Sequence, residues 1–317
     1  MKRRHLLLTA ASLAATTANA QAPWPTRPVT IVVPFAPGGA GNGSVRILAE
    51  VISPQIGQNI VVDNRPGAGG ITGTQTVTSS SDDHTLLMGS TTMTILPALR
   101  SDLPYDVMRD LQPIGMISSQ PVVFAVAANS PLRTLDDLVR EGKTGNLNAG
   151  NSGVGTLSHL TTELLNRKLG TRLVPVPYKG DSVMLPDVAS GTVSMGVFNL
   201  PVAMPLIQGG RLRAVAVTSA QPVAALPGVP TLRALGEDFI ISGWAALFGA
   251  RNVPAAGIER FGTLLRQALG QPSVRERFAS FGVSPEVSTP SQLRDYLRME
   301  TARWTDVVRS RGIKVDS

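Results

Sequence analysis

The sequence predicts an α/β protein built from two domains of the same kind. Runs of β-branched residues, typical of buried strands, alternate with segments of helical periodicity. Several of these runs end in loops rich in glycine or small polar residues. The alternation is interrupted by an apolar run at 122–126 and then starts again. This order is expected of two parallel sheets covered by helices and joined by crossing strands.

The first element is the stretch 29–44, around which the rest of the chain is organised. Residues 30–33 predict a buried strand, which Pro34 and Pro37 end. Glycines follow, and we expect Asn42 or Ser44 to cap a helix that continues beyond residue 51.

A helix that begins after a strand presents unpaired N–H groups and the positive end of its dipole, which suits a carboxylate or a phosphate. The stretch lacks the lysine of a phosphate-binding P-loop and the glycine spacing of a dinucleotide fingerprint. A tight connection that binds no ligand remains the alternative for this loop taken alone.

Two further strands end in similar loops. Residues 60–62 lead into the glycine-rich loop 64–70, after which Thr72 or Thr74 could cap a helix. Residues 85–88 lead into a small polar loop at 89–92. Because the carboxyl ends of parallel strands share one edge of a sheet, the three loops together predict a binding cleft.

The next part of the chain predicts the crossing between the domains. Residues 97–106 are expected to form a loop or short helix, and strands are expected at 114–117 and 121–127. We place the crossing near Ala127, followed by a helix that Thr134 caps.

The second domain repeats the scheme. The loop 148–156 leads into a helix, and strands are expected at 172–176, 193–198 and 213–218. Helices are expected at 184–189 and 202–207, and the return crossing at 239–250. Domain 1 is therefore predicted to comprise residues 24–126 and 246–317, and domain 2 residues 127–245.

Three helices are expected after the return crossing, at 258–269, 272–281 and 290–311. The last one has apolar residues at helical spacing, and we expect it to pack back on the first domain.

Residues 1–20 have the features of a signal peptide. Lys2, Arg3 and Arg4 precede a short apolar run, and Ala18-Asn19-Ala20 fits a cleavage site. Arg3-Arg4 also resembles a twin-arginine signal, and an uncleaved membrane anchor is the alternative. We therefore expect an exported, periplasmic protein. The absence of cysteine excludes disulfides, thiol chemistry and lipid attachment through an N-terminal cysteine.

Composition narrows the class of partner. The formal charge of +7 falls to +4 without the three positive charges of the signal, which suits an anionic ligand. Lys and Arg form no run interleaved with aromatic residues, so nucleic-acid binding is not supported. Aromatic residues are 4% of the chain, too few for a stacking platform.

The sequence gives no catalytic or metal set. Outside the signal the chain has two histidines, His84 and His159, and no Gly-x-Ser-x-Gly motif. Ser152 and Ser158 near His159 would be the candidates for a hydrolase, and Asp82-Asp83 is interpreted as a solvated turn. We expect no enzyme activity, no cofactor and no metal.

Three residues have two open interpretations. Lys179 either lies near the cleft or extends into solvent, and solvent is favoured. Arg65 either contacts the ligand or anchors its own loop, and anchoring is favoured. Trp244 either lines the hinge or pocket or belongs to the core, and neither is favoured.

Several motifs in order resemble those of Bug-type periplasmic solute-binding proteins, the receptors of tripartite tricarboxylate transporters. The resemblance covers nearly all of the chain after the signal. The matching motifs are Trp24-Pro25, Arg27-Pro28 and residues 33–39, 64–70, 103–106, 150–159, 176–180, 199–201 and 212–218.

The resemblance implies a type II periplasmic-binding-protein fold, with two α/β domains joined by two crossing strands and a ligand cleft between them. In the family, main-chain N–H groups, small hydroxyls and waters hold the carboxylate. One end of the ligand is then expected against Phe35, Pro37, Gly38, Gly39, Ala40, Asn42, Ser90 and Thr91. The other end is expected against Ser152, Gly153, Gly155, Thr156, Ser158 and Asn199.

The chain departs from the family at a few positions. Asn42 replaces a frequent Asp, and Gly43 replaces a branched apolar residue. Ser194 and Phe198 also stand where many relatives have Asp, and Phe198 would make the second end of the pocket more apolar. These changes favour a plain or partly apolar carboxylate over an amino acid.

Together these observations predict a monomeric periplasmic protein that captures a small carboxylate, such as a di- or tricarboxylate, for the inner-membrane permease subunits of a tripartite transporter. The alternative is a receptor that feeds a two-component sensor kinase.

Overall fold

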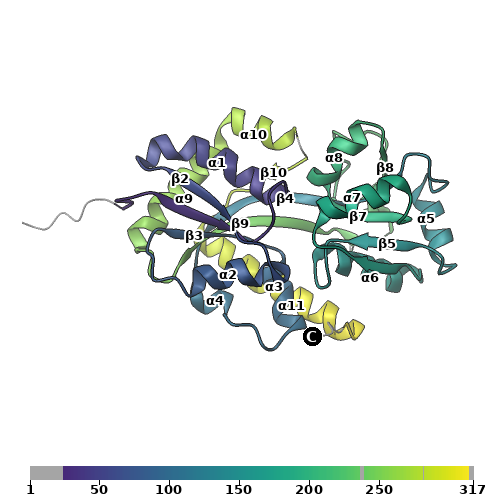
Figure 1. Ribbon diagram of the computed structural model, residues 1–317, viewed down its shortest axis with the longest axis horizontal. Helices are drawn as coiled ribbons and strands as arrows, with labels where there is room; N and C mark the ends of the chain where they lie inside the picture. Colours follow the sequence, from purple (N-terminus) through teal and green to yellow (C-terminus); the bar gives the residue numbers. More distant parts are fainter. Residues whose placement is uncertain (1–23, 236–238, 281, 314–317) are drawn as a thin grey trace, which may run out of the picture.

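The computed structural model describes residues 24–235, 239–280 and 282–313. The predicted signal peptide lies outside the described residues. The chain forms two α/β halves placed side by side (Figure 1), with helices against the strands of each half. Within the described ranges, every helix is too short or too polar to span a bilayer.

The first half contains the N-terminal elements and the C-terminal helices. Its elements before the crossing are β1 (Val29–Val33), α1 (Ala40–Ile56), β2 (Ile60–Asn64), η1 (Ala68–Gly70), α2 (Ile71–Thr78), β3 (Thr85–Ser90), α3 (Thr92–Leu99) and α4 (Val107–Asp110). After the return come α9 (Ala255–Gly270), α10 (Pro272–Ala279), β10 (Ser284–Pro285) and α11 (Pro290–Arg311).

The second half lies between two long strands. It contains α5 (Leu135–Gly142), β5 (Asn148–Asn151), α6 (Leu157–Leu169), β6 (Val174–Pro177), α7 (Asp181–Ser190), β7 (Met195–Asn199), α8 (Leu200–Gln208), β8 (Leu212–Val217) and η2 (Leu232–Leu235). The long strands are β4 (Leu111–Ala127) and β9 (Ser242–Ala250).

Strand pairing runs from one half into the other. In the first half β1 lies parallel to β2 and β3, and β9 is antiparallel to β3. In the second half β5 lies parallel to β6 and β7. The strands follow the order β2-β1-β3-β9-β4-β7-β5-β6, so β4 and β9 connect the two sheets.

The crossing strand β4 is longer than expected. Two strands were predicted at 114–117 and 121–127, with the crossing near Ala127, but one strand spans Leu111–Ala127. Its first part, up to Pro121, pairs with β9, and its second part, from Val122, pairs with β7 and β8. The polar residues Ser118, Ser119 and Gln120 do not break the strand, because they pair with Ala245, Trp244 and Gly243 of β9.

Two other expectations need correction. Helix α3 begins at Thr92, the last residue of the loop predicted at 89–92, and extends to Leu99, into the segment 97–106 that was predicted as loop or short helix. Helix α7 begins at Asp181, whereas its start was predicted at residue 184. The prediction was late because the polar residues Asp181 and Ser182 give little apolar periodicity. The predicted cap at Thr134 is confirmed, since its side chain accepts a hydrogen bond from the Asp137 N–H within a capping box.

The final helix α11 packs on the first half, as predicted, and also contacts the second half. Its early residues Leu293 and Leu297 lie in the core of the first half. Its later residues Trp304 and Val308 lie in the core of the second half. A 22-residue helix is about 33 Å long, which is enough to reach both cores. Figure 1 shows α11 below the sheets, beside α3.

We expect Gly73→Ala to destabilise the loops at the carboxyl edge of the first sheet. A Cβ at Gly73 of α2 would lie 2.7 Å from Pro34 Cα and 2.8 Å from the Arg65 carbonyl oxygen, both backbone atoms of the loops that follow β1 and β2. The overlap should lower the free energy of unfolding by about 1–3 kcal/mol, as measured by urea titration.

The matched control is Gly270→Ala, at the last residue of α9. No described atom lies within 4 Å of a Cβ there, so stability should be unchanged or slightly higher. Equal free energies of unfolding for the two variants would show that the loops after β1 and β2 can move away from α2 without loss of stability.

Candidate functional site

A cavity of about 690 Å³ lies between the two halves. Its wall is made by the loops that follow β1, β2 and β3 in the first half and β5, β6 and β7 in the second, together with the middle of β4 and the start of β9. The predicted arrangement, in which loops at the carboxyl ends of parallel strands meet, is therefore observed.

The start of α1 forms one end of the cavity. Gly39 is the N-cap, with φ −79° and ψ 162°, and no described side chain caps the helix there. The first intrahelical bond runs from Gly43 N–H to the Gly39 carbonyl at 3.0 Å, so the N–H groups of Ala40, Gly41 and Asn42 have no partner within the helix. The predicted cap at Asn42 or Ser44 is wrong, because the helix starts earlier.

Asn42 has a different role from the one expected. Its Nδ2 donates to Asn64 Oδ1 at 3.0 Å, and its Oδ1 accepts from Arg46 Nε at 3.1 Å. Asn64 Nδ2 in turn donates to the Phe35 carbonyl at 2.9 Å. The three side chains therefore hold the loop that precedes α1. Asn64 was not predicted as a positioning residue, because it lies at the end of another strand, 22 residues from Asn42.

The loop after β3 forms part of the cavity wall and is hydrogen-bonded to β9. Thr91 Oγ1 accepts from the Trp244 backbone N–H at 3.1 Å, and the hydroxyls of Ser90 and Thr92 lie 3.0 Å apart. The two interpretations of Trp244 are both correct, because it is buried, contacts Tyr296 edge to face at a ring distance of 5.9 Å, and also lines the cavity. Its Nε1 has no hydrogen-bond partner within the described residues.

The start of α6 forms the other end of the cavity. Thr156 is the N-cap, but its hydroxyl donates to the Gly153 carbonyl at 2.7 Å instead of capping the helix. Ser158 Oγ accepts from the Ser152 N–H at 3.0 Å and lies 2.8 Å from Ser152 Oγ. Gly153 has φ 132°, a conformation that side chains rarely adopt. The loop is thus shaped by its own hydroxyl groups.

His159 supports this loop and does not activate a serine. Its Nδ1 accepts from the Gly155 N–H at 3.1 Å, so that nitrogen carries no proton. Burial lowers the pKa of His159, which favours the neutral ring. Ser158 Oγ has Ser152 and Thr156 as its partners. The geometry of a serine–histidine pair is therefore not formed here.

Most predicted binding residues reach the cavity wall. The lining residues among them are Phe35, Pro37, Gly38, Gly39, Ala40, Asn42, Ser90, Thr91, Ser152, Gly153, Thr156 and Asn199. Gly155 and Ser158 lie behind the wall, where Ser158 is buried and contacts Ser152. Contact of each lining residue with a ligand remains a prediction.

Phe198 was expected to make the second end of the pocket more apolar, but its side chain does not line the cavity. Its side chain is fully buried in the core of the second half with Met184 and Leu200. Neighbouring residues of a strand point to opposite faces, so Asn199 lines the cavity while Phe198 points away.

Asp181 is the functional candidate that sequence analysis missed. It is the first residue of α7, lines the cavity and is 7% exposed. Its Oδ2 accepts from Asn199 N at 3.0 Å and Asn199 Nδ2 at 2.8 Å, while Oδ1 has no partner among the described residues. Burial raises the pKa of Asp181, and hydrogen bonds from Asn199 and Ser152 oppose this. An acid after a glycine at a helix start was the available signal.

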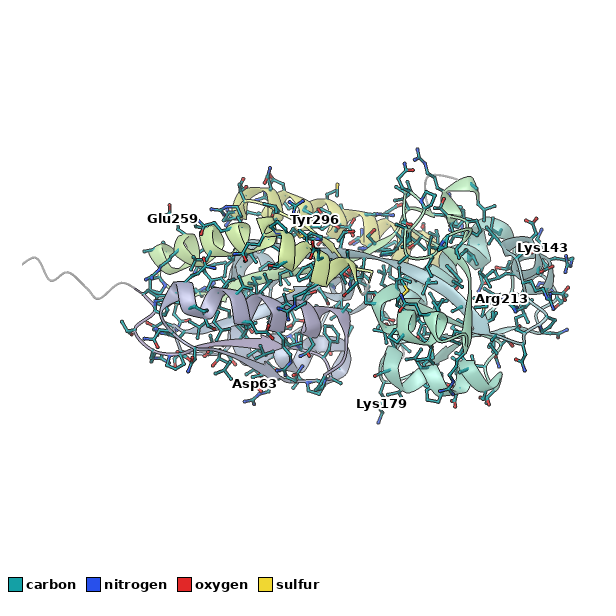
Figure 2. All side chains as sticks on the ribbon, turned by 90° about the horizontal axis from the view of Figure 1, so that it is seen from above. Asp63, Lys143, Lys179, Arg213, Glu259 and Tyr296 are labelled. Atoms are coloured by element: carbon teal, nitrogen blue, oxygen red, sulfur yellow. The ribbon has the colours of Figure 1, made fainter. Side chains whose placement is uncertain are left out.

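A cation of the second half and an acid of the first half lie along one edge of the molecule. Lys179 lines the cavity from the second half with its side chain exposed, and Figure 2 shows it on the same edge of the molecule as Asp63. Asp63 Oδ2 accepts from Arg65 Nε at 2.8 Å, and Arg65 does not line the cavity. The anchoring interpretation of Arg65 is therefore supported.

One cluster of metal-ligand type occurs among the described residues. The ligand atoms of Asp82, Asp83 and His84 lie within 4.8 Å of one another. Asp82 and Asp83 both pair with Arg27, and His84 Nε2 accepts from the Thr26 N–H at 3.0 Å. The cluster does not line the cavity, and its contacts fix the segment before β1.

Comparison with known proteins gives consistent matches. The profile of a family described as "Tripartite tricarboxylate transporter family receptor" matches residues 44–313. Protein BugT of Bordetella pertussis is 34% identical over 298 residues, which cover 92% of this chain and 91% of BugT.

Two solved structures are also similar. R. palustris Rpa4515 with adipate is 30% identical, with a TM-score of 0.87 over 92% of this chain and 99% of that one. MatC (Rpa3494) from Rhodopseudomonas palustris with bound malate is 29% identical, with a TM-score of 0.82 over 90% of this chain and 99% of that one.

Asp181→Asn should stabilise the unliganded protein at high pH. Burial raises the pKa of this carboxyl above 3.8, so the folded state loses stability as the pH rises past that value and the group must ionise. We expect a higher thermal midpoint for the variant at pH 8 and a gain that shrinks toward pH 4.

The control is Asp136→Asn, which removes an exposed acid from α5 and should give no such pH-dependent gain. A lower midpoint for Asp181→Asn at pH 8 would contradict the account, since it would mean that the protein stabilises the Asp181 charge.

Proposed function

The chain belongs to the receptor family of the tripartite tricarboxylate transporters, and from this we propose that it captures a small carboxylate in the periplasm for such a transporter. Membership confirms the predicted resemblance and the two-domain α/β fold of a periplasmic binding protein. The relatives of known structure that contain adipate and malate support a carboxylate as ligand.

The observation that carries the proposal is the pair of uncapped helix starts at opposite ends of the cavity. Ala40 at the start of α1 and Leu157 at the start of α6 both line it. A helix N-terminus stabilises an anion by about 0.3–1 kcal/mol when exposed and by up to about 2 kcal/mol when partly buried. The start of α1, with its free N–H groups, provides a site for carboxylate oxygens without a buried arginine, and the start of α6 provides donors for an oxygen atom at the other end of the ligand.

Closure of the two halves would complete the site. We propose that the bodies are residues 24–126 with 246–317, and residues 127–245, and that β4 and β9 form the hinge. The change of partners of β4 after Pro121 supports a division close to that position. A ligand that contacts both walls favours the closed form, which the permease subunits would then recognise.

We propose further that the protein acts as a monomer and performs no chemistry. The buried Ser158 has other hydroxyls as partners, and His159 is occupied by the Gly155 N–H, which supports a binding role. The predicted signal at residues 1–20 accounts for export to the periplasm, by the twin-arginine route or another.

A thermal-shift screen of the protein without residues 1–20 tests the function. The acids are succinate, malate, citrate, adipate, aspartate and glutamate. A ligand at a hundred times its dissociation constant stabilises by about 2.7 kcal/mol, which raises the midpoint by several degrees. At least one acid should do this. If none does, and 4-hydroxybutanoate, 4-aminobutanoate, 6-hydroxyhexanoate and 6-aminohexanoate do not either, the proposed function is wrong.

Gly39→Asp should abolish most of the binding without loss of stability. Gly39 has a negative φ, and no described atom lies within 4 Å of a Cβ there, so a side chain fits. An Asp N-cap accepts hydrogen bonds from the free N–H groups and adds a negative charge, which excludes a ligand carboxylate. We expect at least about a tenfold loss of affinity by calorimetry for the acid with the largest thermal shift.

Gly39→Ala is the matched control, because alanine occupies the same space and leaves the N–H groups free. It should keep affinity close to that of the unsubstituted protein. Unchanged affinity for Gly39→Asp would show that the ligand does not lie at the start of α1.

A further inference from the structure

We propose that Asp181 turns the second-half end of the cavity into a hydrogen-bond-accepting subsite, so that the preferred ligand is a carboxylate whose far end carries a hydroxyl or ammonium group instead of a second carboxylate. This inference rests on the proposed function and narrows the class of ligand within it.

Two hydrogen bonds from Asn199, through its N and Nδ2, reach the Asp181 carboxylate at Oδ2, and the Ser152 side chain also acts on this carboxyl group as a hydrogen-bond donor. Asp181 lines the cavity and is only 7% exposed. Its other carboxylate oxygen, Oδ1, has no hydrogen-bond partner in the described part of the chain. A buried carboxylate oxygen without a partner is costly, and a ligand donor would satisfy it.

A second acceptor lies on the same wall. Gln120 of β4 lines the cavity, is 7% exposed, and its Oε1 also lacks a partner among the described residues. A Cβ at Gly243 would lie 2.9 Å from Asn199 Oδ1 and 3.1 Å from Gln120 Nε2, so the two amides converge at the hinge. Asp181 is joined to Asn199, and Asp181 Oδ1 and Gln120 Oε1 are two buried acceptors without a partner among the described residues.

Charge disfavours a second carboxylate at this end. Among the described residues that line the cavity, Asp181 is the acid and Lys179 is the cation, and Lys179 is exposed. A carboxylate beside Asp181 would therefore face a like charge in a buried setting, without a buried cation to offset it. A hydroxyl or ammonium group faces an acceptor instead, and an ammonium group also gains an ion pair.

The two ends of the cavity thus differ in chemistry. The start of α1 offers free N–H donors, and no acid lines that end in the described structure. At the second-half end, the free N–H groups at the start of α6 lie on a wall that also carries the acid Asp181. The wall formed by Asp181, Asn199 and Gln120 offers acceptors. A ligand with a carboxylate at one end and a hydrogen-bond donor at the other matches both ends.

Calorimetry with matched ligands tests the inference on the unsubstituted protein at pH 7.5. The probes are 4-hydroxybutanoate, 4-aminobutanoate and succinate, and the longer set 6-hydroxyhexanoate, 6-aminohexanoate and adipate. In at least one set, the hydroxy or amino acid should bind at least about tenfold more tightly than the diacid of the same length. Preference for the amino or the hydroxy member identifies the donor as ammonium or hydroxyl.

Variants assign the preference to Asp181. Asp181→Asn keeps the shape of the side chain and removes its charge, so the preference over the diacid should fall below about threefold. Asp136→Asn, on the exposed face of α5, should keep the preference of the unsubstituted protein. Unfolding of each variant without ligand, followed by circular dichroism, separates loss of binding from loss of fold.

The outcomes separate this inference from the proposed function. If both diacids bind the unsubstituted protein as tightly as their partners, the inference is wrong and the proposed function stands. The inference is also wrong if Asp181→Asn keeps the full preference. If no acid in either set or in the thermal-shift screen binds, the proposed function fails, and the inference fails with it.

Discussion

The free backbone N–H groups at the starts of α1 and α6 are the constraint on which the site depends. At Gly39 no described side chain takes up these donors, and at Thr156 the hydroxyl bonds to Gly153 instead. The surrounding polar side chains hold the loops from behind: Asn64 holds the Phe35 carbonyl and His159 holds the Gly155 N–H. The donors are thereby fixed in place and left available to an anion.

The connection between the halves explains how both ends could act on one ligand. Strand β4 pairs with β9 and then with β7 and β8, so its middle residues lie both at the crossing and in the cavity wall. Helix α11 reaches the cores of both halves through Leu297 and Trp304, and Tyr296 on it contacts Trp244 beside the cavity. The proposed closure would therefore involve the strands and this helix together.

The sequence predicts the strands and loops well, because β-branched runs and glycines are local signals. It fails where a side chain's partner is distant. Asn42 was expected to cap α1, but Asn64 and Arg46 occupy its amide. Phe198 was placed in the pocket, but the pleat turns it into the core. Asp181 was missed because an acid after a glycine at a helix start gives only a weak local signal, and its hydrogen bonds come from Asn199, 18 residues further along the chain.

The most direct measurement is a crystal structure of the protein with a bound carboxylic acid. The account predicts a carboxylate oxygen within about 3 Å of the N–H groups at the start of α1, between Ala40 and Asn42. It also predicts that the other end of the ligand reaches the wall formed by α6, Asp181 and Asn199. A ligand whose carboxylate lies away from both helix starts, or is held by an arginine outside this cavity, would contradict it.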